Sequence, residues 1–192
     1  MKHITFYLDF ISPYAYLAFE RLPRALEGLS YEVHYKPVLL GALLRHHGQR
    51  GPAEIDAKRA WTYRHIQWLA LDHSVPFNMP TQHPFNPLPL LRLAIACGQH
   101  GACNRYVAET IFRHVWTGGH DAVNADRLAS VTEQLAPARS AGDEDVKQEL
   151  RTNTETAINM QVFGVPSMVV DDEMFWGLDA LPMLRQCMQD LA

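Results

Sequence analysis

The sequence predicts an α/β fold in which a β-α-β unit and a β-β-α unit are separated by a large all-helical insertion. Three observations predict it. Residues 3–38 change from strand-like to helix-like patterning and back, residues 41–157 carry mostly helical apolar spacing, and two short strand-like segments follow residue 166. A chain of 192 residues is long enough for one such domain with an inserted lobe.

The first unit consists of two strands and the helix between them. Residues 3–8 alternate between polar and apolar side chains, and residues 31–38 are rich in aromatic and β-branched side chains, as strands are. Residues 13–26 have helical spacing, and Pro13 suits the first helical position. A β-α-β order implies a parallel strand pair with a right-handed crossover.

The insertion and the second unit follow. Apolar spacing predicts helices near residues 56–73, 88–100, 104–117, 125–135 and 143–160, separated by prolines and glycines. Residues 167–170 and 173–176 read as two strands joined by a turn, and residues 179–191 read as a closing helix. We therefore predict one domain from residues 1–40 and 158–192, and a helical insertion domain from residues 41–157.

Composition restricts the partners. A net charge of −4 gives no electrostatic reason to expect nucleic acid or an anionic membrane. The N-terminus is neither a signal peptide nor a membrane span, so we expect a cytoplasmic protein that binds a small molecule. Cys97, Cys103 and Cys187 are too widely spaced for a zinc motif and are expected to be buried thiols. The ten histidines show no His-Glu-x-x-His pattern, so no metal is expected.

Two distant segments carry the candidate chemistry. Ser12 lies at the predicted start of a helix, directly before Pro13, where capping alone would explain a serine. A helix start also favours negative charge, so the hydroxyl could serve as a directed donor to an anion. Near the other end, Val165-Pro166 precedes a strand, and Asp179 can cap the last helix. No histidine or aspartate pattern indicates a serine hydrolase triad around Ser12.

Taken together, these segments resemble the 2-hydroxychromene-2-carboxylate isomerase family, which is related to the kappa-class glutathione transferases and to bacterial thiol:disulfide oxidoreductases. The resemblance extends over nearly the whole chain. It is carried by five segments in the same order: Phe6-Tyr7-Leu8-Asp9-Phe10-Ile11-Ser12-Pro13, residues 36–43, residues 153–158, Phe163-Gly164-Val165-Pro166-Ser167 and residues 172–179.

The resemblance implies a thioredoxin-like fold whose redox cysteine is replaced by Ser12, and it implies glutathione as the cofactor. Ser12 would donate a hydrogen bond to the glutathione thiolate, and the backbone of Val165, before a proline that is usually cis, would pair with the cysteinyl unit. The segment Trp176-Gly177-Leu178-Asp179 would hold the γ-glutamyl end. Many relatives carry Arg where this chain has Ala180, so that salt bridge is missing. A homodimer is also implied.

The second-substrate side is less well defined. The resemblance implies a cation that holds a substrate carboxylate, and Arg45 is the nearest candidate, although a gapless alignment places Leu44 there. Lys58 and Arg59 are alternatives, or solvated helix charges. In the proline-rich loop, His83 and Asn86 could line the pocket or only shape the loop. The tryptophans of the insertion are expected in the helical core, namely Trp61, Trp68 and Trp116.

The function that this resemblance implies is a glutathione-dependent isomerisation of 2-hydroxychromene-2-carboxylate, or of a related intermediate of aromatic breakdown such as naphthalene degradation, to trans-o-hydroxybenzylidenepyruvate. Two alternatives remain open: a kappa-like glutathione transferase that conjugates electrophiles, and a redox-silent thioredoxin-like binding module. A disulfide oxidoreductase is the least supported, because no cysteine lies near Ser12 in the sequence.

Overall fold

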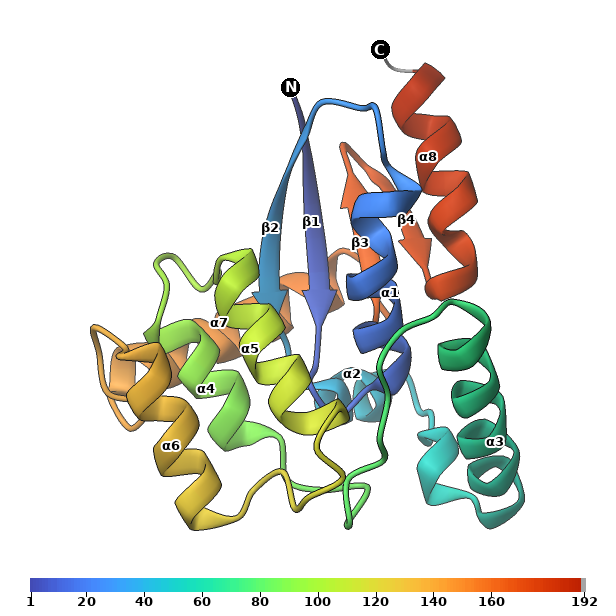
Figure 1. Ribbon diagram of the computed structural model, residues 1–192. Coiled ribbons are helices and arrows are strands. Elements are labelled where there is room, and N and C mark those ends of the chain that lie inside the picture. The colour runs from blue at the N-terminus through green and yellow to red at the C-terminus, as the bar shows by residue number, and fades with distance from the viewer. Residues whose placement is uncertain (191–192) are drawn as a thin grey trace.

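The computed structural model describes residues 1–190, which form a β-α-β unit, a run of helices and a β-β-α unit in that order (Figure 1). The α/β class and the order of elements predicted from the sequence are therefore confirmed. Residues 191 and 192, which include the end of the helix predicted over 179–191, lie outside the described residues. The division into domains 1–40 with 158–192, and 41–157, stays a prediction.

Four strands form one mixed sheet in the order β2-β1-β3-β4. β1 (Lys2–Leu8) pairs in parallel with β2 (Tyr31–Pro37), as a β-α-β unit requires. On its other side β1 pairs antiparallel with β3 (Ser167–Val170), which is antiparallel to β4 (Glu173–Trp176). The first and last parts of the chain therefore meet at the centre of the sheet.

The helices surround this sheet (Figure 1). The described residues form α1 (Pro13–Ala25), α2 (Leu40–His46), the short 3₁₀ turn η1 (Pro52–Glu54), α3 (Asp56–Asp72), α4 (Leu88–Ala96), α5 (Arg105–Trp116), α6 (Ala125–Leu135), α7 (Glu144–Asn159), the 3₁₀ turn η2 (Leu178–Ala180) and α8 (Leu181–Asp190). Helix α2 was not predicted as a separate element, and the predicted helix 88–100 ends earlier, before Gly98. No helix among these residues has the length and apolar character needed to cross a bilayer.

The core lies on both faces of the sheet because side chains of β1 alternate between them. Ile4, Phe6 and Leu8 are fully buried in the main core, which also contains the apolar side of α1. Tyr7, the residue between two of these, belongs to a second and smaller cluster with Ala157 of α7. Figure 1 shows α1 and α8 side by side on one face of the sheet, while α7 crosses the other.

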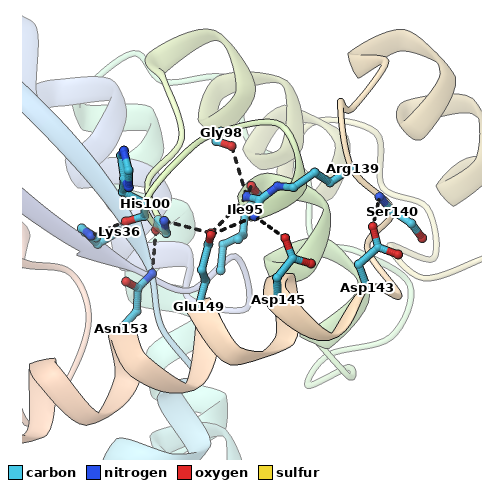
Figure 2. Close-up of polar contacts among 11 residues, drawn as sticks. Lys36, Ile95, Gly98, His100, Arg139, Ser140, Asp143, Asp145, Glu149 and Asn153 are labelled. Atoms are coloured by element: carbon cyan, nitrogen blue, oxygen red, sulfur yellow. Dashed lines mark hydrogen bonds and ion pairs between the residues drawn. The ribbon is translucent and has the colours of Figure 1, made fainter.

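A polar network connects separate helices of the insertion to one another and to the sheet (Figure 2). The Arg139 guanidinium contacts Glu149 of α7 at 2.8 Å and donates to the carbonyl oxygens of Ile95 and Gly98 at 2.8 and 3.1 Å. These carbonyl oxygens lie at the end of α4, where backbone acceptors lack helical partners. One guanidinium therefore satisfies the end of α4 and ties it to α7.

The three tryptophans of the insertion do not share one environment. Trp116 is fully buried and donates from Nε1 to the carbonyl oxygen of Phe10 at 3.0 Å, so its predicted place in the core is confirmed. Trp61 and Trp68 are 55% and 58% exposed, so that prediction is wrong for them. They lie on α3, which buries only Ile66 and Ala70, because this helix lies at the edge of the molecule.

Candidate active site

Ser12 caps the N-terminus of α1. Its Oγ accepts a hydrogen bond from the amide of Ala15 at 3.2 Å, and Pro13 occupies the first helical position, as predicted. The side chain is nearly buried, and its Oγ also lies 3.4 Å from the carbonyl oxygen of Val165. That second contact is at the outer limit of hydrogen-bond length. The hydroxyl proton can therefore turn to a nearby acceptor while the oxygen continues to cap the helix.

The turn before β3 lies directly opposite Ser12. The Val165–Pro166 peptide bond is cis, and the Pro166 carbonyl oxygen accepts from the amide of Gly177 at 3.0 Å. Within residues 1–190, the amide of Val165 has no hydrogen-bond partner. Its N–H is thus available to an extended ligand lying beside the turn, in the way that a strand is added to a sheet edge.

The segment after β4 forms the next part of the wall. Gly177 adopts φ +96°, a conformation that favours glycine, and it leads into the turn η2. The rings of Trp176 and Phe163 pack in a tilted arrangement, with ring centroids 4.9 Å apart. The exposed Asp179 carboxylate makes no hydrogen bond or ion pair with any described residue, so the capping role considered for it is not observed.

Two tyrosine–histidine pairs connect the insertion to the start of α1 and to residues 9–12, which join β1 to α1 and are called the Ser12 loop. The Tyr63 hydroxyl lies 2.6 Å from Nδ1 of His83, and Nε2 of His83 lies 2.8 Å from the carbonyl oxygen of Ile11, the residue before Ser12. Since a carbonyl oxygen only accepts, Nε2 carries the proton and donates to it. Burial lowers the pKa of His83, against a smaller raising effect of the Ile11 hydrogen bond. A neutral His83 then accepts from Tyr63 and holds the Ile11 carbonyl.

The second pair is Tyr14 and His65. The Tyr14 hydroxyl, two residues after Ser12, lies 2.9 Å from Nδ1 of His65 on α3. Burial raises the pKa of Tyr14, and the nearby negative charge of Asp179 raises it further. Tyr14 therefore stays protonated near neutral pH and presents a hydroxyl donor close to the site.

Asp9 is a buried carboxylate beneath the Ser12 loop. It is fully buried and accepts from the amide of Ile11 at 3.1 Å and from the amide of Leu40, at the start of α2, at 2.9 Å. Burial raises its pKa to about 7, although both amide hydrogen bonds act in the opposite direction. Asp9 thus fixes the loop before Ser12 relative to α2.

All of these groups line one open cavity of about 1670 Å³ between the ends of the strands, α2 and α3. The predicted site residues that line it are Ser12, His83, Val165, Pro166, Trp176, Gly177, Leu178 and Asp179. Arg45 and Asn86 do not. Leu44 lines the cavity in place of Arg45, and the exposed Asn86 accepts from the amide of Leu88 at 3.1 Å.

The cations that line the cavity include Lys58, which the sequence offered as an alternative to Arg45, and Arg50, which the sequence did not single out. Neither of the two has a carboxylate partner among the described residues, whereas Arg59 is paired with Asp56 at 2.8 Å. None of the cysteines lines the cavity. Cys103 is buried, and burial raises its pKa to about 12. The wall is therefore mostly apolar, with hydroxyl donors at one side, cations without a carboxylate partner at another and no thiol among the residues that line it.

Comparison with known proteins agrees with this geometry. The family of DsbA-like thioredoxin domains matches residues 3–189. A 2-hydroxychromene-2-carboxylate isomerase from Pseudomonas putida is 30% identical over 96% of this chain and 93% of its own. The chain belongs to the 2-hydroxychromene-2-carboxylate isomerase family of DsbA-like thioredoxin domains. The predicted family and the thioredoxin-like fold are thereby confirmed.

Two further proteins place the family in context. A solved structure of a 2-hydroxychromene-2-carboxylate isomerase superposes with a TM-score of 0.82 at 26% identity, covering 98% of this chain and 95% of the other. Glutathione S-transferase kappa 1 from Rattus norvegicus is 24% identical over 94% of this chain and 88% of its own. These relatives are enzymes, and the fold is shared along the full length.

Sequence reasoning did not find the two tyrosine–histidine pairs, the role of Asp9 or Arg50, although it named Lys58 as an alternative cation. Tyr63 and His65 belong to α3, and their partners lie far from them in the sequence, so only the packing of α3 brings each pair together. Asp9 was visible only as part of the motif before Ser12. A buried acid between a strand and a helix start was the one signal that could have singled it out.

Proposed function

We propose that the protein is a glutathione-dependent isomerase acting on 2-hydroxychromene-2-carboxylate or a closely related product of aromatic breakdown. The observation that carries this is the position of Ser12. A hydroxyl at a helix N-terminus lies 3.4 Å from the carbonyl oxygen of Val165, whose amide is unpaired among the described residues, and both residues line a cavity without cysteines. This arrangement suits a ligand that brings its own thiol and an extended peptide backbone.

The residues fit glutathione in three places. The Ser12 hydroxyl and the start of α1 would stabilise a thiolate, because a helix N-terminus favours negative charge. The Val165 amide would pair with the cysteinyl unit. The free Asp179 carboxylate would attract the γ-glutamyl ammonium, while backbone amides at the turn Leu178–Ala180 would donate hydrogen bonds to the γ-glutamyl carboxylate. At about 1670 Å³ the cavity exceeds the roughly 300–1,000 Å³ of ordinary ligand sites. It therefore leaves room for a second substrate.

Bound glutathione would supply a nucleophilic sulfur whose reversible addition turns a rigid double bond of the substrate into a rotatable single bond. The chain's own residues would do the rest. Arg50 and Lys58, which line the cavity, would hold the substrate carboxylate and stabilise negative charge that develops on the pyruvate oxygens. Apolar walls such as Leu44 would hold the aromatic ring, and the shared cavity keeps both reactants together.

The test is the absorbance-monitored conversion of 2-hydroxychromene-2-carboxylate by the purified protein, with and without glutathione. We expect conversion only with glutathione, which is not consumed. Loss of glutathione during turnover of an electrophile would instead support a kappa-like transferase. No turnover and no glutathione binding would refute both and leave the redox-silent binding module. Cytoplasmic location and a homodimer, which the resemblance implies, are part of this proposal.

Ser12 has two roles that variants can separate. Ser12→Ala removes the cap and the hydroxyl, while Ser12→Asp keeps a capping acceptor and loses the donor. We expect both variants to lose at least about tenfold in turnover. Asn104→Ala is a matched control, because Asn104 caps α5 in the same way, with 2.9 Å to the amide of Val107, outside the cavity. It should lose stability and keep activity. Full turnover by Ser12→Asp would contradict the donor role.

A further inference from the structure

Three possible metal ligands gather at the start of the sheet, at the end away from the cavity. His3 lies near the start of β1, and its register partner on the parallel strand β2 is Glu32. His34 follows two residues later on β2, so it shares a face with Glu32. The register therefore places two imidazoles and one carboxylate on the same exposed face of adjacent strands.

The distances between these side chains suit one metal ion. His3 Nδ1 lies 3.2 Å from one Glu32 oxygen, and His34 Nε2 lies 3.7 Å from the other. One ligand atom from each residue lies within 4.8 Å of the other two. Ligands at about 2.1 Å from a tetrahedral zinc ion are separated by roughly 3.4 Å, so small side-chain rotations would bring all three into position.

The surroundings favour a metal ion that keeps a coordination position open to water. The three side chains are 65%, 47% and 46% exposed, in the order His3, Glu32 and His34, so water can complete the coordination. Lys36, two residues further along β2, directs its ammonium to the carbonyl oxygen of His100 at 2.8 Å, which removes it as an internal counter-ion for Glu32. Two nitrogen ligands and one oxygen ligand suit Zn²⁺ or Cu²⁺ and are poor ligands for Mg²⁺.

We propose that His3, Glu32 and His34 form a surface site for a divalent transition metal, with Zn²⁺ as the physiological class of ion. The ion would join β2, which lies at the edge of the sheet, to the central strand β1. Sequence spacing could not show this site, because one ligand comes from a different strand and the parallel register sets its place. Motif spacing predicted no metal site, and this proposal, which rests on strand pairing, departs from that prediction.

The site is independent of the proposed function. His3 lies near the start of β1, whereas Ser12 follows its end, and five residues of strand span roughly 16 Å. Figure 1 shows the start of β1 at the end of the sheet opposite to α2 and α3, which line the cavity. Metal binding is therefore expected to change stability and to leave glutathione-dependent turnover unchanged.

The experiment is calorimetric titration of ZnCl₂ into the full chain after removal of metals with a chelator. We expect one equivalent to bind, the midpoint of thermal unfolding to rise with zinc, and no response to MgCl₂. His34→Gln and Glu32→Gln should each weaken the zinc affinity at least about tenfold, as the loss of metal-site partners does. Cu²⁺ added in place of zinc should show two-nitrogen coupling by electron paramagnetic resonance, and His34→Gln should reduce it to one nitrogen.

His46→Gln is the matched control. His46 is also exposed and lies against a second histidine, His47, with ring centroids 4.9 Å apart, but no carboxylate joins that pair in an ion pair among the described residues. This variant should bind zinc as tightly as the unchanged chain. The proposal is overturned if no equivalent binds, if His34→Gln binds as well as the unchanged chain, or if His46→Gln weakens binding to the same extent.

Discussion

Replacing Asp9 by Asn tests the balance of forces beneath the Ser12 loop. The fully buried carboxylate accepts one amide with each oxygen, from Ile11 at 3.1 Å and Leu40 at 2.9 Å. Burial penalises its charge, and the amide donors favour the charge. The burial effect is the larger one, and it raises the pKa of Asp9 from 3.8 to about 7.

The sign of the effect on stability follows from proton binding. Below about pH 4 both the folded and unfolded states hold the proton, and above about pH 7 neither does. Between these limits only the folded state holds it, so Asp9 favours folding at low pH and this contribution is lost as the pH rises. At about 1.4 kcal/mol per pKa unit, the change across the window is about 4 kcal/mol.

The assay is urea unfolding of the unchanged chain and of Asp9→Asn between pH 4 and pH 8. The asparagine has one acceptor instead of two, so through one amide left unpaired the variant should be about 1 kcal/mol less stable than the chain with protonated Asp9 near pH 4. Because asparagine does not titrate, the variant should become the more stable protein as Asp9 ionises above about pH 7. The informative quantity is the unfolding free energy of the unchanged chain minus that of Asp9→Asn, because the contributions of all other titrating groups cancel in this difference. We expect this difference to fall steadily from pH 4 to pH 7 and to level off above it.

Two results would refute this reasoning. A difference that does not change with pH means that Asp9 does not titrate in the window. A difference that rises with pH means that the amides of Ile11 and Leu40 outweigh burial and keep the carboxylate ionised. Either result would also remove Asp9 as a source of pH dependence in the Ser12 loop.

Three further predictions concern other parts of the molecule. Arg139→Met should lower the unfolding free energy by about 2 kcal/mol, because Glu149 and two carbonyl oxygens lose a charged donor; thermal and urea unfolding measure this. Tyr63→Phe should cost only about 1 kcal/mol of stability but lower kcat in the isomerase assay, because His83 loses the donor at 2.6 Å. Gly177→Ala should cost about 1–3 kcal/mol, since φ is +96° there, and should weaken glutathione binding measured by calorimetry.

Each of these predictions has a contradicting result. Unchanged stability in Arg139→Met would mean that water replaces the guanidinium at the end of α4. Equal turnover by Tyr63→Phe would mean that Tyr63 only packs, and Tyr106→Phe, an exposed tyrosine on α5, is its control. Glutathione binding that is unaffected in Gly177→Ala would place the γ-glutamyl end elsewhere.

The parts of the site that could be predicted from the sequence are those held by the sheet. Ser12 follows β1 and Pro166 precedes β3, and these two strands are neighbours, so the order of elements alone brings the two segments together. The helix start at Ser12 was visible because a serine before a proline has a local physical cause. Local signals and strand order were sufficient there.

The substrate side could not be predicted in the same way. Successive residues on a helix point about 100° apart, so Leu44 of α2 lines the cavity while the next residue, Arg45, is exposed to solvent. The apolar and aromatic residues of α3 do not follow one stripe, and Trp61 and Trp68 are exposed for that reason. Which face of each inserted helix lines the cavity depends on packing against distant segments, which periodicity does not encode.

The central place of β1 has a consequence for synthesis of the protein. Phe6 pairs with Met168, so one edge of β1 finds its partner only when the last part of the chain has left the ribosome. Until then that edge exposes unpaired backbone groups beside the apolar residues of the first unit. Pairings between such distant residues form slowly, and partly made chains with open strand edges tend to aggregate. We therefore expect the nascent chain to depend on chaperones, and truncations before β3 to be insoluble.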